Sequence, residues 1–177
     1  MAITPDTKDW TWVLERPCEE CGFEAKDHPP STFSQAIRMN AARWTGVLSR
    51  DDVRLRPRED RWSALEYACH VRDVYRIFDE RLRLMLEHDS PVFQNWDQDQ
   101  TALEERYDLQ DPTIVNGELL DLATQYADRF DTVTPSQWDR TGTRSNGSAF
   151  TVSSLGTYGL HDPFHHLWDV SASQNRD

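Results

Sequence analysis

Residues 63–88, SALEYACHVRDVYRIFDERLRLMLEH, decide the fold class of this chain. The stretch contains neither Gly nor Pro, and its apolar side chains recur at the spacing of a helix with one buried face. Those apolar positions are Leu65, Cys69, Val74, Ile77, Phe78, Leu82, Met85 and Leu86. Ser63 and Glu66 have the spacing of a capping box, in which each side chain accepts a hydrogen bond from the other's backbone N–H. The pattern therefore predicts a long amphipathic helix over 63–88.

Three further segments have the same helical spacing, whereas strand periodicity is almost absent. The expected helices are 32–49, 63–88, 113–132 and 151–172, with a short one near 98–106. A loop rich in Gly, Ser, Thr and Asn is expected at 140–148. Four long helices predict an all-α fold, an antiparallel four-helix bundle over 32–177. The first part of the chain, 1–31, reads as an irregular N-terminal arm.

The charge of the chain restricts its partners. Its 177 residues include 31 acidic and 19 Lys or Arg residues, which gives a net charge of −12. Such a surface repels phosphate backbones and anionic lipids, so we expect no nucleic-acid and no membrane partner. No stretch approaches the ~18 apolar residues of a membrane span, and no secretory signal is visible. A disulfide scaffold normally has a larger and even number of cysteines, and this chain has three, so the expected location is cytoplasmic.

Histidines on two of the expected helices form a candidate metal site. His161 and His165 lie four residues apart and share one helix face. His70 lies on the helix at 63–88, and facing helices of a bundle can build a metal site together. Three imidazoles suit zinc first, with nickel, iron or cobalt as alternatives, and leave a coordination position open. The simpler alternative is a surface pair and a buried histidine with no ion.

Pro163 stands between His161 and His165 and cannot donate the hydrogen bond to the carbonyl of Gly159. Either the helix kinks near Gly159, or it starts afresh with Asp162 as its N-cap. A fresh start would leave His161 outside the helix. The apolar spacing continues across this region, which favours the kink.

The arm contains a second candidate site, Cys18-x-x-Cys21. The pair supplies half of a zinc site, with His28 as a candidate third ligand and no fourth in view. A redox dithiol is the second alternative, although such pairs normally begin a helix in a strand-rich context. The third alternative is two cysteines in an ordered turn without further chemistry.

Two short motifs resemble the DinB-like superfamily, which includes thiol-dependent S-transferases and mycothiol-dependent maleylpyruvate isomerases. The motifs are residues 62–66 followed by His70, and His161-Asp162-Pro163-Phe164-His165-His166. The resemblance implies a four-helix bundle with a divalent metal held by three histidines, at positions matched by His70, His161 and His165. His166 matches a neighbour of the last ligand and lies about 100° from it around the helix, too far to bind the same ion.

The resemblance implies a metal-dependent S-transferase, in which a bound ion lowers the pKa of a small thiol such as mycothiol for attack on a small electrophile. The alternatives are a thiol-dependent isomerase, a metal-dependent hydrolase, or a non-catalytic metal-binding or accessory bundle. Glu66 is either a partner that orients His70 or only the capping carboxylate. Related bundles often pair, which leaves a homodimer as a further expectation.

Overall fold

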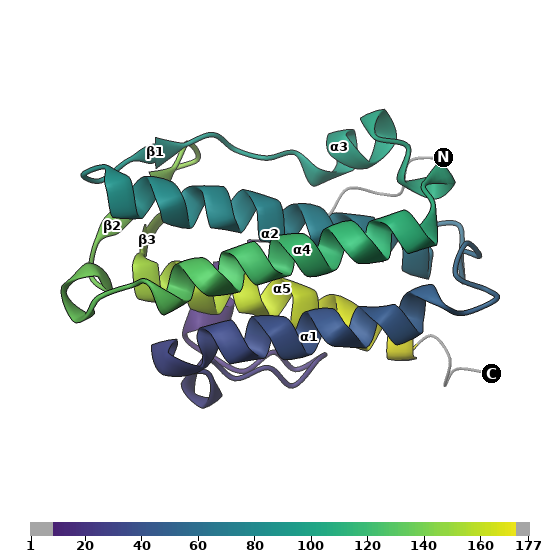
Figure 1. The fold of residues 1–177 in the computed structure, drawn as a ribbon, viewed down its shortest axis with the longest axis horizontal. Helices are drawn as coiled ribbons and strands as arrows, with labels where there is room; N and C mark the ends of the chain where they lie inside the picture. Colours follow the sequence, from purple (N-terminus) through teal and green to yellow (C-terminus); the bar gives the residue numbers. More distant parts are fainter. Residues whose placement is uncertain (1–8, 173–177) are drawn as a thin grey trace.

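The computed structural model describes residues 9–172, and four long helices lie side by side in it (Figure 1). They are α1 (Phe33–Leu48), α2 (Ala64–Glu87), α4 (Pro112–Asp131) and α5 (Val152–Ala172). The short α3 (Gln98–Glu104) lies in the connection between α2 and α4. The predicted helices and the four-helix bundle are confirmed. The outer ends of the predicted arm and bundle, 1–8 and 173–177, lie outside the described residues.

The capping box at the start of α2 forms as predicted. The Glu66 backbone N–H donates to Ser63 Oγ at 3.2 Å, and the Ser63 N–H donates to Glu66 Oε2 at 2.8 Å. Arg56 Nε also donates to Glu66 Oε2, at 2.9 Å. The Glu66 carboxylate is thus held by Ser63 and Arg56, which favours the capping role over a role in orienting His70.

The helices do not pack in the order in which they follow one another along the chain. α4 packs against both α1 and α2, and α5 packs against the same two helices, while α1 and α2 contact each other much less. Large side chains such as Trp44, Tyr75 and Tyr126 fill the space between the four helices. As a result, one face of α5 is directed at α2, where His70 lies.

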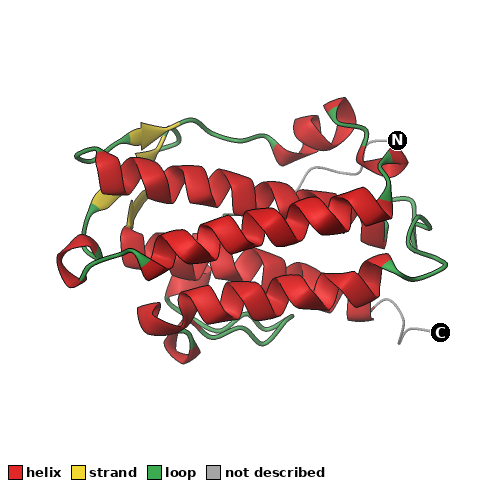
Figure 2. Ribbon diagram, in the orientation of Figure 1, coloured by secondary structure: helices red, strands yellow, loops and turns green. Residues whose placement is uncertain are grey.

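A small sheet corrects the expectation of a purely helical fold (Figure 2). β1 (Val92–Phe93) pairs in parallel with β2 (Thr141–Arg144), which pairs antiparallel with β3 (Ala149–Thr151). β2 and β3 are joined by a tight turn with Gly147 at φ +94°. The loop predicted at 140–148 is therefore mostly hairpin. Strands of two to four residues are too short to produce a readable alternation, and the Asn-Gly turn signal was the only cue.

α5 runs unbroken from Val152 to Ala172 with Pro163 inside it. The fresh start at Asp162 is therefore excluded, and His161 belongs to the helix. Gly159 permits a close approach here, because a Cβ built on it would lie 2.5 Å from Phe78 Cδ1 and 2.9 Å from Tyr126 Oη. The backbone of α5 can thus pack directly on side chains of α2 and α4.

Gly159→Ala is expected to lower the free energy of unfolding, because the added methyl overlaps Phe78 at an overpacking cost of about 1–3 kcal/mol. This cost outweighs the gain of about 1 kcal/mol that alanine brings to a helix. Gly117→Ala in α4 is the matched control, since no atom lies within 4 Å of its built Cβ, and it should be neutral or stabilising. Chemical denaturation measures both variants. Equal changes in the free energy of unfolding of the two variants would show that Gly159 is not needed for the close approach of α5 to α2 and α4.

The arm is ordered and packs against α5. It contains three short 3-10 helices, Thr11–Leu14, Ala25–Asp27 and Pro30–Thr32, and the first of them contacts α5. Val13, Cys18 and Phe23 are buried, and Cys18 and Phe23 belong to the main hydrophobic core. The arm therefore forms one wall beside the histidines of α5.

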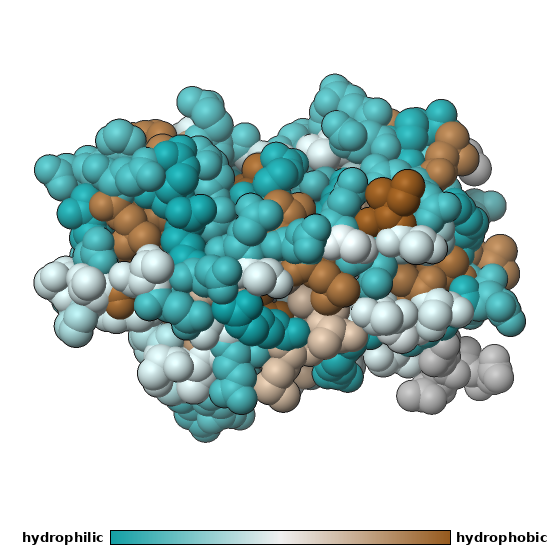
Figure 3. All heavy atoms as spheres, viewed as in Figure 1, coloured by the Kyte–Doolittle hydropathy of each residue, from teal (hydrophilic) through white to brown (hydrophobic). Residues whose placement is uncertain are grey.

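The visible surface of the molecule is largely polar. The face seen in Figure 3 is mostly hydrophilic, with apolar residues scattered over it. Among residues 9–172, no helix combines the length and apolar character needed to cross a membrane.

Candidate metal centre

α5 carries two pairs of side chains of metal-ligating types, and the members of each pair are four residues apart. His161 and His165 form one pair, and Asp162 and His166 form the other. Residues four apart share a helix face, whereas a shift of one residue turns the side chain by about 100°. The two pairs therefore face different neighbours, His161 and His165 towards the arm and Asp162 and His166 towards α2.

The pair facing α2 meets His70. His70 Nε2 lies 3.2 Å from Asp162 Oδ1, and His166 Nε2 lies 3.5 Å from the same oxygen. One ligand atom from each of the three residues lies within 4.8 Å of the others. We call this group the α2–α5 cluster.

Aromatic and acidic neighbours orient the two imidazoles of this cluster. His70 is fully buried, and the indole of Trp96 stacks on its ring with the centroids 5.3 Å apart and the planes 7° apart. His166 Nδ1 lies 3.0 Å from Asp169 Oδ2, and Asp169 accepts from Arg61 Nη1 at 3.0 Å. An imidazole that binds a metal commonly donates its other N–H to a carboxylate, which is the arrangement of His166 and Asp169.

The two carboxylates beside these imidazoles, Asp162 and Asp169, have lowered pKa values. Burial by itself would raise the pKa of Asp162, but His70 and His166 outweigh it and hold that pKa well below its usual range. Burial also acts to raise the pKa of Asp169, and the hydrogen bond from His166 outweighs it and lowers the value. Both carboxylates are therefore ionised near neutral pH. Two imidazoles around an ionised carboxylate are a donor set that suits a divalent ion, so these residues fit the metal that the resemblance implies.

The pair facing the arm meets the two cysteines. Cys18 Sγ lies 3.6 Å from His165 Nδ1, and one ligand atom each from Cys18, Cys21, His161 and His165 lies within 4.8 Å of the other three. We call this group the arm cluster. Burial raises the pKa of the Cys21 thiol to about 12. The position of both thiols beside two imidazoles favours the metal alternative over the redox one.

His28 lies outside the arm cluster as the structure describes it. Its ring stacks on Phe23, with the centroids 4.8 Å apart and the planes 7° apart, and also contacts Phe164. The remaining donors beside Cys18 and Cys21 come instead from α5. Sequence spacing could not reveal them, because they follow the cysteines by roughly 140 residues.

The structure divides the three histidines that the sequence analysis groups as metal ligands. His70 lies in the α2–α5 cluster, whereas His161 and His165 lie in the arm cluster. Asp162 and His166, which the sequence analysis leaves outside the ligand set, take the places beside His70. A signal for them was present, because Asp162 and His166 have the same four-residue spacing as His161 and His165.

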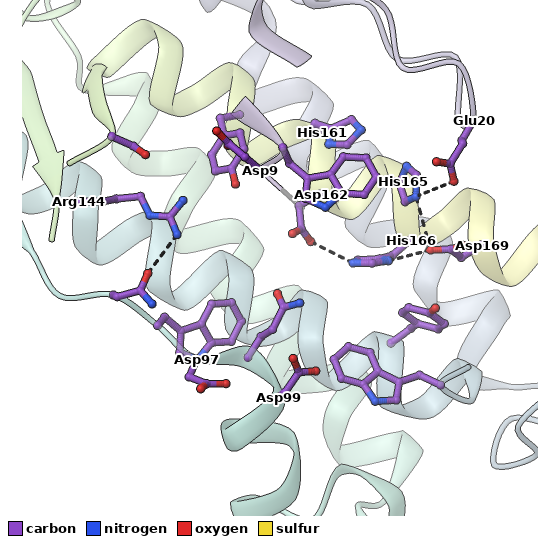
Figure 4. Close-up of a pocket in the computed structure, with 18 of the residues that line it drawn as sticks. Asp9, Glu20, Asp97, Asp99, Arg144, His161, Asp162, His165, His166 and Asp169 are labelled. Carbon is purple, nitrogen blue, oxygen red and sulfur yellow. Dashed lines mark hydrogen bonds and ion pairs between the residues drawn. The ribbon is translucent and has the colours of Figure 1, made fainter. Parts of the chain in front are cut away.

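Both clusters border a cavity of about 890 Å³ between the arm, α5 and the segment around α3 (Figure 4). Figure 4 shows His166 between Asp162 and Asp169, with Glu20 of the arm directed at His165. Seven carboxylates and two arginines are among the lining residues, together with three tryptophans. These are Asp9, Glu20, Asp60, Asp97, Asp99, Asp162 and Asp169, Arg61 and Arg144, and Trp10, Trp62 and Trp96. The cavity thus favours hydroxylated or cationic ligands over anions.

Comparison with known proteins gives the family. No curated protein matches the chain. Among solved structures, the chain is similar to YfiT from Bacillus subtilis, described as a probable metal-dependent hydrolase with an unusual four-helix bundle topology. The TM-score is 0.73 at 18% identity, over 92% of this chain and 94% of YfiT, which is a likeness of fold. A family model for the DinB superfamily matches residues 33–170. Because that match spans most of the length of this chain, the chain belongs to the DinB superfamily.

Proposed function

We propose that this protein is a metal-dependent S-transferase that uses a small, hydroxyl-rich thiol of the mycothiol type against a small electrophile. The observation that carries the proposal is the α2–α5 cluster at the wall of an acidic, aromatic cavity. Fold likeness to YfiT, whose description includes metal dependence, adds support for a metal-dependent reaction.

His70, Asp162 and His166 would hold the ion, with zinc expected first and nickel or iron as alternatives. Three protein donors leave at least one coordination position for a substrate, which distinguishes a catalytic site from a closed structural one. When bound, a divalent ion would supply positive charge that lowers the pKa of a thiol beside it. Asp169 would hold His166 in the tautomer with Nε2 directed at the cluster.

The cavity would receive the substrates. Among the described residues that line it there is no cysteine, so the protein offers no thiol nucleophile of its own at this wall. Trp62 and Trp96 provide flat apolar faces for the ring of a sugar or cyclitol, while Asn95, Gln98 and Asp97 can bind hydroxyl groups. A volume of about 890 Å³ has room for a thiol and a second small molecule.

In the proposed reaction the thiol sulfur forms a bond to an electrophilic carbon. The bond from that carbon to its leaving group breaks, and the leaving group departs with the electron pair. The thiol proton passes to solvent. The acidic lining disfavours dicarboxylate electrophiles such as maleylpyruvate. We therefore favour the S-transferase over the thiol-dependent isomerase.

Hydrolysis is a second candidate, favoured by one specific observation. Two histidines and one carboxylate form the donor set of several zinc hydrolases. YfiT, which shares the fold, is described as a probable hydrolase. The two candidates differ in whether a thiol is needed.

The test supplies zinc-loaded protein with monochlorobimane and, in parallel, mycothiol, glutathione or no thiol. Formation of the mycothiol conjugate faster than the uncatalysed rate, with glutathione clearly poorer, is the expected result. A parallel assay with p-nitrophenyl acetate in the absence of thiol tests hydrolysis. Activity there alone would replace the S-transferase with a hydrolase. The absence of activity in both assays, in protein whose metal content is complete, would favour a non-catalytic bundle.

A further inference from the structure

We infer that the arm cluster is a second metal site, a closed structural zinc site formed by Cys18, Cys21, His161 and His165. It is distinct from the α2–α5 cluster and does not depend on the proposed function. Its role would be to fasten the N-terminal arm to α5.

The donor set of the arm cluster is that of a structural zinc site. Two thiol sulfurs come from one turn of the arm, and two imidazoles come from one face of α5. Two sulfurs with two nitrogens form a common structural zinc set, and four protein ligands leave no position for a substrate. The set also differs from that of the α2–α5 cluster, which contains no sulfur.

The distances between the four ligand atoms are close to those around a tetrahedral zinc ion. Bonds of ~2.3 Å from zinc to sulfur and ~2.0 Å to nitrogen place tetrahedral ligand atoms roughly 3.3–3.8 Å apart. The distance from Cys18 Sγ to His165 Nδ1 is 3.6 Å. The four ligand atoms already lie within 4.8 Å of one another. A bound ion would therefore require side-chain adjustments of about an ångström and no change of fold.

The arm's backbone is shaped to present both thiols. The Cys18 N–H donates to the Phe23 carbonyl at 2.9 Å, and the Gly22 N–H donates to the Cys18 carbonyl at 2.8 Å. Gly22 has φ +75°, a conformation that glycine adopts without strain. This closed turn brings Cys18 and Cys21 to the same side, and both thiols are free.

The surroundings of His165 are also those of a ligand. Its Nδ1 faces Cys18, while its Nε2 lies 3.7 Å from Glu20 Oε2 and 3.9 Å from Asp169 Oδ2. Carboxylates beside the second ring nitrogen orient metal-binding histidines in many sites. Cys18, His161 and His165 are 1%, 3% and 7% exposed and Cys21 is partly exposed, so three of the four ligands are buried.

The site would determine the shape of the cavity. The ring of Trp10 lies against both histidines, with centroids 5.4 Å from His161 and 5.0 Å from His165. Trp10 and Glu20 of the arm both line the cavity. Fastening the arm through zinc therefore holds one wall of the cavity in place.

The experiment measures metal content and the spectrum of the cobalt-substituted protein. Protein purified without a metal-affinity tag should carry about two zinc ions per chain, and Cys18→Ser and His70→Ala should each carry about one. With cobalt, the wild type and His70→Ala should show a near-ultraviolet thiolate-to-cobalt charge-transfer band, and Cys18→Ser should lose it. Cys69→Ser is the matched control. Its thiol lies 3.6 Å from Gln110 Oε1 and belongs to neither cluster, so the variant should behave as wild type.

Full metal content in Cys18→Ser would overturn the inference. So would a wild-type cobalt spectrum without the charge-transfer band, which decides the question even where Cys18→Ser fails to fold. A Cys18–Cys21 disulfide in protein kept under reductant would overturn it as well. Failure of the proposed function would give a different result. Cys18→Ser would still lose one ion, while the wild type would show no catalysis, and the structural zinc site would be supported.

Discussion

Asp162→Asn is expected to lower kcat/KM, measured after purification in the presence of zinc, by about a hundredfold or more, if the α2–α5 cluster holds the catalytic ion as proposed. Asp162 Oδ1 lies 3.2 Å from His70 Nε2 and 3.5 Å from His166 Nε2, so its negative charge would offset that of a cation held by the three side chains. The amide has nearly the same shape but no charge. It is therefore a weaker ligand, and the cluster should lose metal while the helix remains.

The measurement is the rate of bimane conjugation at fixed mycothiol, with the zinc content determined on the same sample. Asp121→Asn on the exposed side of α4 is the matched control, since it removes one carboxylate that is not part of the cavity lining. Circular dichroism checks that both variants keep their helices. Unchanged kcat/KM in Asp162→Asn would remove the α2–α5 cluster from the reaction.

Removal of metal from the wild type with a chelator is expected to lower the melting temperature by roughly 10 °C. An ion present at about a thousand times its dissociation constant stabilises the native state by about 4 kcal/mol, and a chain of this size shifts by about 2–4 °C per kcal/mol. The arm should also become sensitive to protease, because Cys18 and Cys21 no longer connect it to α5. Calorimetry and limited proteolysis followed by mass spectrometry measure the two effects.

Variants assign this effect to one of the two sites. His70→Ala retains the arm cluster and should still lose stability and arm protection when the chelator is added. Cys18→Ser should begin with a lower melting temperature and an arm already open to protease, and chelation should change the arm little further. Cys69→Ser should respond as the wild type does. Equal protection of the arm in chelated and zinc-loaded wild type would contradict the expectation.

α5 connects the two clusters through neighbouring residues. His161 and Asp162 are adjacent, as are His165 and His166, yet each neighbour belongs to a different cluster. A rotation of about 100° per residue produces this division. Disturbing the arm cluster should therefore change substrate binding through Trp10 and Glu20 without removing a ligand of the α2–α5 cluster.

The amino-acid sequence by itself determined the four long helices and the start of α2. Helical periodicity, the Ser63–Glu66 capping box and the absence of Gly and Pro over 63–88 are local features, acting over a few residues. The sequence also contained every donor of both clusters. The short strands escaped prediction because residues 92–93, 141–144 and 149–151 are each too brief for periodicity to appear.

Only the tertiary structure decided which donors meet. Cys18 and His165 are separated by 147 positions and come together because the arm folds back onto α5. His70 meets Asp162 and His166, and not the equally spaced His161 and His165, because of the rotation at which α5 packs on α2. That rotation depends on close packing at Gly159 and on the sum of many side-chain contacts, which no short stretch of sequence encodes.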